Sequence, residues 1–308
     1  MAGAREVLLA GLVDYAGLFP PAGLDMQGAV SRYAACRRGG CAWMLGRFVL
    51  PASRLDEFEA AALSPSSARS GQQWSLSAVL TPPLDASWTT VQAFNLRNRG
   101  LAAVEAAECR VASVAEVDRL SGLCGDRISV AYEVPLDQGA LGAMLDAIAL
   151  AGGMAKVRMG GLVPDAIPSS GSVAAFVGAC AVRRQPFKAT AGLHHPVRSL
   201  HALTHEPASP VAEVHGFLNV AAAVLFARTL AGRGLDAPTI AATLVEVLEE
   251  RDPAHFVLSE DGFGWGACVW SAEEVNEARA SGLRSVGSCS FEEPVRDLQA
   301  MRWIDGMV

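Results

Sequence analysis

Short apolar runs alternate with amphipathic stretches along most of this chain, a pattern typical of a parallel sheet covered by helices. Helices are expected near 25–37, with Asp25 as a possible N-cap, and then near 113–123, 141–150 and 172–182. The eight strand-like runs lie at 7–19, 42–50, 74–81, 100–108, 127–135, 153–161, 186–196 and 284–291.

Eight strand-like runs, seven of them followed promptly by a helix, predict a (β/α)8 barrel, here as a single domain over residues 1–308. An open doubly wound sheet has the same alternation and is the alternative. The nucleotide-binding versions of that sheet lose support, because no GxGxxG follows the first run and GxxxxGK[ST] occurs nowhere.

The alternation breaks after the seventh run, over residues 197–283. Two strong helices are expected near 216–231 and 238–250, and a third near 272–281. Between them, Asp261-Gly262 suits the tight turn of a β-hairpin. We expect this segment to be an insertion on the catalytic face of the barrel.

Composition narrows the class of protein. A net charge of −7 argues against binding to nucleic acid, which needs a basic patch. The sequence contains no charge-free run of about 18 apolar residues, so we expect no membrane span. The apolar N-terminal stretch lacks a basic start and is interrupted by Asp14, so we expect no signal peptide. The 7 cysteines, odd in number and without CxxC spacing, indicate reduced thiols in a cytoplasmic protein.

The chain has only two lysines, Lys156 and Lys188, and each lies in a strand-like run. An amine can lose its proton when buried, and this allows chemistry that a guanidinium cannot perform. Side chains at the carboxyl ends of barrel strands face the active site. By run, the candidates there are Asp14 and Tyr15; Arg47; Glu105; Glu133; Lys156 and Arg158; Lys188, Thr190, His194 and His195; and Ser288, Cys289 and Ser290.

The stretch Lys-Ala-Thr-Ala-Gly-Leu at 188–193 resembles the lysine motifs of class I aldolases of the deoxyribose-phosphate aldolase type. In those barrels a lysine on strand six and another on strand seven act together: one forms a Schiff base, and the other lowers its pKa. The resemblance implies these two roles for Lys156 and Lys188. Lys156 departs from the family pattern, because Val-Arg-Met-Gly-Gly follows it in place of a Thr/Ser-rich turn.

The main hypothesis is therefore lyase or aldolase-like chemistry on a small carbonyl, keto-acid or sugar-type substrate, without a cofactor. Glu133 and His195 would move protons, and Arg47 and Arg158 would hold an anionic group of the substrate. Further contacts to the substrate are expected from Thr190, Asp14 and Ser288. In the plainer alternative, the lysines only form ion pairs with Glu105 and Glu133.

Two further alternatives stay open. A divalent metal such as zinc could be held by His194, His195, His215 and Glu133, although no HxH or HExxH pattern occurs. The chain could also be a non-catalytic partner protein that forms homo-oligomers, with the apolar helix at 216–231 as its interface.

Overall fold

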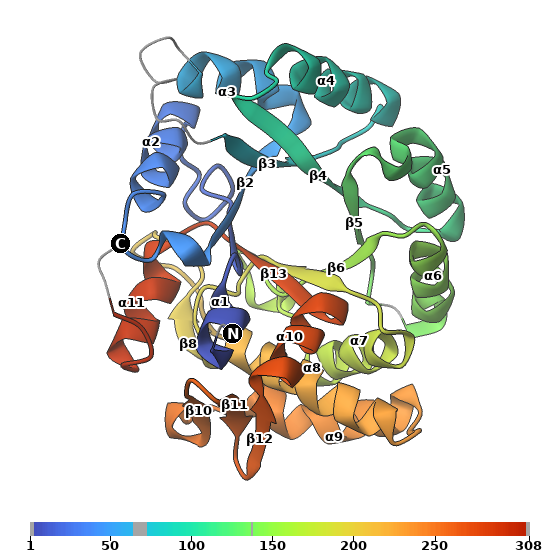
Figure 1. The fold of residues 1–308 in the computed structure, drawn as a ribbon, viewed down its shortest axis with the longest axis vertical. Helices are drawn as coiled ribbons and strands as arrows, with labels where there is room; N and C mark the ends of the chain where they lie inside the picture. Colours follow the sequence, from blue (N-terminus) through green and yellow to red (C-terminus); the bar gives the residue numbers. More distant parts are fainter. Residues whose placement is uncertain (1–2, 64–72, 137, 306–308) are drawn as a thin grey trace.

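Eight parallel strands close into a barrel in the computed structural model, which describes residues 3–63, 73–136 and 138–305 (Figure 1). Around the ring the order is β1, β13, β7, β6, β5, β4, β3 and β2, so the first strand pairs with the last. The predicted (β/α)8 barrel is confirmed. The strand bounds are β1 (Val13–Tyr15), β2 (Leu45–Pro51), β3 (Trp74–Val79), β4 (Ala102–Arg110), β5 (Ser129–Glu133), β6 (Met154–Arg158), β7 (Phe187–Thr190) and β13 (Leu283–Ser288).

Helices surround the barrel, and several begin at side chains that cap them. Asp25 accepts a hydrogen bond from the Gly28 amide at 2.7 Å, which confirms it as the cap of the first surrounding helix. Ser113 and Ser169 cap α5 and α7 in the same way. The helices of this layer are α2 (Met26–Cys36), α3 (Leu55–Ala62), α4 (Leu84–Arg97), α5 (Val114–Cys124), α6 (Gln138–Leu150), α7 (Ser170–Arg183), α8 (Phe217–Gly232), α9 (Ala237–Glu249), α10 (Ala272–Ser281) and α11 (Glu292–Ala300).

The N-terminal apolar run is only partly a strand, and here the prediction was wrong. Residues Ala4–Leu9 form helix α1, and β1 covers only Val13–Tyr15. Gly11, at φ +56°, lies in the turn between them, in a conformation that suits glycine. A continuous apolar run has no periodicity that separates a buried helix from a buried strand.

The segment 197–283 divides between the two ends of the barrel. Its first part, the hairpin of β8 (Ser199–Ala202) and β9 (Val211–Val214), lies beside α11 at the carboxyl ends of the strands: the His201 ring stacks on His195, which bonds Asp297. The predicted hairpin near Asp261-Gly262 is present within a three-stranded sheet of β10 (Phe256–Leu258), β11 (Gly262–Trp265) and β12 (Cys268–Ser271).

That three-stranded sheet lies against α1, which leads into the amino end of β1 (Figure 1). The amide of Ala4 donates to the carbonyl of Glu260 at 2.9 Å. The expectation that the whole segment covers the catalytic face is therefore wrong for its second half.

The apolar helix expected at an oligomer interface is α8, and neighbouring elements of the same chain cover it. It packs against α7, α9, α10 and β13, and most of its side chains are buried. Buried Asn219 ties it to the end of α9 by donating to the carbonyls of Val247 and Glu250 at 2.8 and 2.9 Å. The apolar character of this helix is thus explained by packing within the chain.

By length and composition alone, one helical stretch among the described residues, Pro164–Arg183, could cross a membrane. Of this stretch, 44% is buried, and α7 within it packs against α6, α8 and α9. Such burial is what the outer helical layer of a barrel requires.

Candidate active site inside the barrel

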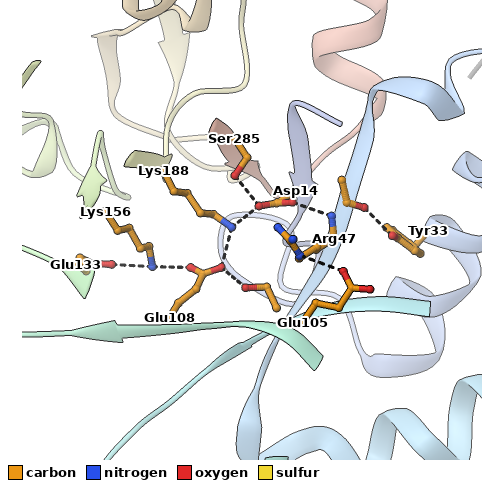
Figure 2. Close-up of polar contacts among 11 residues, drawn as sticks. Asp14, Tyr33, Arg47, Glu105, Glu108, Glu133, Lys156, Lys188 and Ser285 are labelled. Carbon is orange, nitrogen blue, oxygen red and sulfur yellow. Dashed lines mark hydrogen bonds and ion pairs between the residues drawn. The ribbon is translucent and has the colours of Figure 1, made fainter. Parts of the chain in front are cut away.

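The two lysines lie side by side in the barrel interior and share one carboxylate. Lys156 on β6 is in register with Lys188 on β7. Both ammonium groups bind Glu108 of β4: Lys156 Nζ is 2.8 Å from Oε2, and Lys188 Nζ is 2.7 Å from Oε1 (Figure 2). Each lysine also has a carboxylate of its own, since Glu133 lies 2.9 Å from Lys156 and Asp14 lies 2.6 Å from Lys188. We call these five residues the lysine–carboxylate network.

Hydrogen bonds from the surrounding strands hold the carboxylates in place. Ser77 on β3 donates to Glu108 at 2.7 Å. Ser285 on β13 donates to Asp14 Oδ2 at 2.8 Å, and the backbone amide of Arg47 donates to Oδ1 at 2.7 Å. Gly46 makes room for this contact, because a Cβ there would lie 2.4 Å from Asp14 Oδ1. The network and the groups that hold it thus come from all eight strands of the barrel.

The network is almost closed to solvent except at one edge. Exposed fractions of its five residues run from 2% for Asp14 and Glu108 to 7% for Glu133. Beyond it, Arg158 donates from Nε to Glu133 Oε1 at 3.1 Å, and its side chain is 55% exposed. Arg158 therefore marks the edge at which the network meets water.

Burial and pairing set the charge states. Burial by itself raises the pKa of Glu108, but Lys156 and Lys188 outweigh it and hold the pKa well below the usual range of a glutamate. The pKa of Glu133 is also lowered, because Lys156 and Arg158 outweigh the effect of burial. Burial lowers the pKa of Lys188, but Asp14 and Glu108 raise it more, so the balance is upward. Lys188 is therefore a cation at neutral pH.

Glu108 is the network member that sequence reasoning missed, and a β-bulge explains why. Leu76 and Ser77 of β3 pair with Val104 and Ala106 of β4, which leaves Glu105 as the extra residue. Side chains three apart on a regular strand face opposite sides, so the bulge is what lets both glutamates face the interior. Glu105, expected beside the lysines, instead accepts from Ser75 Oγ at 2.5 Å.

Arg47 does not join Arg158 in an anion clamp. Its Nε lies 3.6 Å from Glu105 Oε2 (Figure 2). Arg158 instead contacts Glu133, at 3.1 Å. The two arginines therefore bind different carboxylates. Thr190, predicted to contact substrate, does lie two residues beyond Lys188 on the same face of β7, next to Gly287 of β13.

In the described part of the chain, the bonds of His194 and His195 go to residues outside the lysine–carboxylate network, so nothing there supports the predicted role of His195 as proton carrier. His195 Nδ1 is 2.6 Å from Asp297 Oδ2 on α11. His194 Nδ1 lies 3.0 Å from Glu293 and 3.1 Å from Ser288 Oγ. Ser288, predicted to contact the substrate, therefore bonds His194 and no member of the lysine–carboxylate network.

His215, the third histidine of the metal alternative, is fully buried elsewhere. Its Nε2 bonds the Pro168 carbonyl at 2.8 Å, and Nδ1 faces the Arg198 guanidinium at 3.3 Å. Within the described ranges, no three or more His, Cys, Asp or Glu side chains are placed to hold a metal ion. The four residues of the metal alternative, which include Glu133, therefore do not come together.

Comparison with models of protein families finds no match to this chain. Comparison with curated proteins finds no significant similarity either. The fold therefore defines the class: the chain is a (β/α)8 barrel, an architecture that commonly carries enzymatic sites at the carboxyl ends of its strands. A barrel hosts many unrelated reactions, so the function must be argued from the side chains.

Proposed function

We propose that the chain is an enzyme that forms a Schiff base between Lys156 and a small anionic carbonyl compound, in lyase or aldolase-type chemistry. The observation that carries this proposal is the pair of buried lysines on adjacent strands, joined through Glu108. Two charged amines inside a barrel are costly to bury, and such groups concentrate at functional sites.

The different surroundings of the two lysines suggest different roles. Lys188 is the inner one, with a side chain 3% exposed, and its raised pKa keeps it charged. Lys156 bonds Glu133, which borders the exposed Arg158. A nearby cation makes loss of a proton from an amine easier. Lys188 therefore serves as the fixed charge, and Lys156 serves as the nucleophile.

Substrate binding supplies the activation step. In the structure Arg158 lies 3.1 Å from Glu133. The carboxylate or phosphate of the substrate binds Arg158 and draws this cation away from Glu133. Glu133 then becomes more basic and takes the proton of Lys156 Nζ, 2.9 Å away. The neutral amine adds to the carbonyl carbon, and the carbinolamine loses water to give the imine. Glu133 returns the proton to the departing hydroxyl group.

Borohydride trapping tests this proposal directly. The protein is incubated with a panel of keto acids and aldehydes, reduced, and analysed by intact mass and peptide mapping. Apart from the two lysines, the only amine able to form an imine is the one at the N-terminus, so the adduct is assigned without ambiguity. We expect the adduct on Lys156, and we expect Arg158→Gln to reduce trapping of anionic compounds but not of neutral ones.

The competing interpretation is that the network only holds the barrel together. It rests on the observation that both ammonium groups already bind two carboxylates each. Trapping separates the two interpretations. If the whole panel reacts only at the N-terminal amine, the catalytic proposal is wrong and the structural role stands.

A further inference from the structure

A cysteine, a histidine and a glutamate form a second cluster, outside the barrel interior. Cys289 directly follows β13, and Glu293 lies in the first turn of α11. His194 comes from the loop after β7. Its ring nitrogens both lie 3.9 Å from Cys289 Sγ, and its Nδ1 is 3.0 Å from Glu293 Oε2. The imidazole thus contacts both a thiol and a carboxylate.

Two members of this cluster, Cys289 and Glu293, border a cleft of about 470 Å³. Cys289, Ser290 and Glu293 lie along its wall, with Glu292 and the arginines Arg32 and Arg296 around them. Glu293 is balanced by His194, which leaves two arginines against Glu292. The cleft is therefore large enough for a small molecule and carries a modest excess of positive charge.

The order of the groups suits nucleophilic chemistry. Burial lowers the pKa of His194, but Cys289 and Glu293 raise it more, to about 10, so the ring is an imidazolium at neutral pH. An imidazolium beside a cysteine stabilises the thiolate, which is the nucleophilic form. Cys289 also precedes the N-terminus of a nine-residue helix, α11, where the dipole favours negative charge.

A buried phenol is coupled electrostatically to residues of this cleft. The Tyr15 hydroxyl is buried and has no hydrogen-bond partner in the part of the chain that the structure describes. Its pKa is raised, first by burial and then by Glu292, and Arg32 and Cys289 also act on it. Glu292, Arg32 and Cys289 all line the cleft.

We propose that the cleft is a second reactive site, in which Cys289 is the nucleophile and His194 the proton donor, for small electrophiles that carry a carboxylate. With an aldehyde, the sulfur forms a bond to the carbonyl carbon, the carbonyl π electrons move to oxygen, and His194 supplies the proton, giving a thiohemiacetal. Arg32 and Arg296 bind the carboxylate. This site is independent of the lysines and does not rest on the function proposed for them.

Competitive alkylation of the native protein tests the nucleophile. Iodoacetamide is added in small excess at pH 7, and labelling of the cysteines is followed by peptide mass spectrometry. Cys268 is the internal control, because it is partly exposed whereas Cys289 is only 8% exposed. We expect Cys289 to react about tenfold faster than Cys268 despite its lower exposure. If Cys268 reacts as fast or faster, the proposal is overturned.

Variants then test the two partners. His194→Gln should slow labelling of Cys289 to the rate of an ordinary thiol and leave Cys268 unchanged. Unfolding would be recognised, because buried Cys36, Cys124 and Cys180 would then be labelled too. With iodoacetate in place of iodoacetamide, the preference for Cys289 over Cys268 should increase, and Arg296→Gln should remove that increase. An equal preference for the two reagents would overturn the assignment of a carboxylate-bearing ligand.

Discussion

Replacing Glu108 by glutamine is the sharpest test of the lysine–carboxylate network. The substitution keeps the shape of the side chain and removes the charge that two ammonium groups share at 2.7 and 2.8 Å. Glu108 is 2% exposed, so water cannot replace the lost interaction. Removing one partner of a buried ion pair typically costs about 3–5 kcal/mol. Lys156 keeps Glu133 and Lys188 keeps Asp14, so we expect the lower end, about 3 kcal/mol.

Glu105 provides the matched control on the same strand. Its side chain is 46% exposed, and its ion pair with Arg47 is long, at 3.6 Å. Ion pairs of this kind contribute at most about 1 kcal/mol, so Glu105→Gln should change the stability little. Urea unfolding followed by circular dichroism at pH 7 gives both free energies of unfolding, and equal slopes against urea would show that the unfolded states are comparable. Equal losses in the two variants, or a larger loss at Glu105, would refute the register that the bulge imposes.

Three further predictions concern pH and packing. The pKa values of Glu108 and Glu133 are lowered in the fold, so their stabilisation is present above the ordinary glutamate pKa of 4.5 and is lost as the pH falls; urea unfolding between pH 3 and 7 should show this loss, and Glu108→Gln should flatten it. Gly122→Ala, in α5 with open space at its Cβ, should stabilise by about 0.5–1 kcal/mol. Gly178→Ala, whose Cβ would lie 2.9 Å from the carbonyl of residue 237, should destabilise by about 1–3 kcal/mol; thermal unfolding of both variants checks the difference in sign. Asn219→Ala removes both hydrogen bonds to the end of α9 and should cost about 3 kcal/mol in urea unfolding, and a loss below about 1 kcal/mol would show that water replaces the amide.

The succession of strands and helices could be predicted because apolar runs and caps are local signals. Asp25 and the turns around glycine mark element ends within a few residues. Alternation within a strand also accounts for Lys156 and Arg158 sharing one face of β6, and Lys188 and Thr190 one face of β7. The first apolar run, 7–19, was predicted wrongly as a strand, because a short apolar helix and a buried strand have the same continuous hydrophobic pattern.

The members of the site were harder to predict than its position. Inside a barrel, which carboxylate meets which lysine depends on the register of strands far apart in the sequence. The bulge at Glu105 shifts that register by one residue and carries Glu108 to the lysines. Two acids three apart in one strand were the only local sign of it. The histidines of the metal alternative gave a misleading signal, since His194 and His195 are bound by α11, a hundred residues later in the chain.

The network also divides the barrel unequally between its two halves. Strands β1 to β4 contribute Asp14 and Glu108, two carboxylates without a lysine, whereas β5, β6 and β7 contribute both lysines and only Glu133. Neither half could bury its own charges alone, because one half would hold uncompensated negative charge and the other uncompensated positive charge. A gene cut between β4 and β5 would therefore yield two fragments that are individually poorly folded and electrostatically complementary. Their reassembly would join the halves through the same contacts that close the intact barrel.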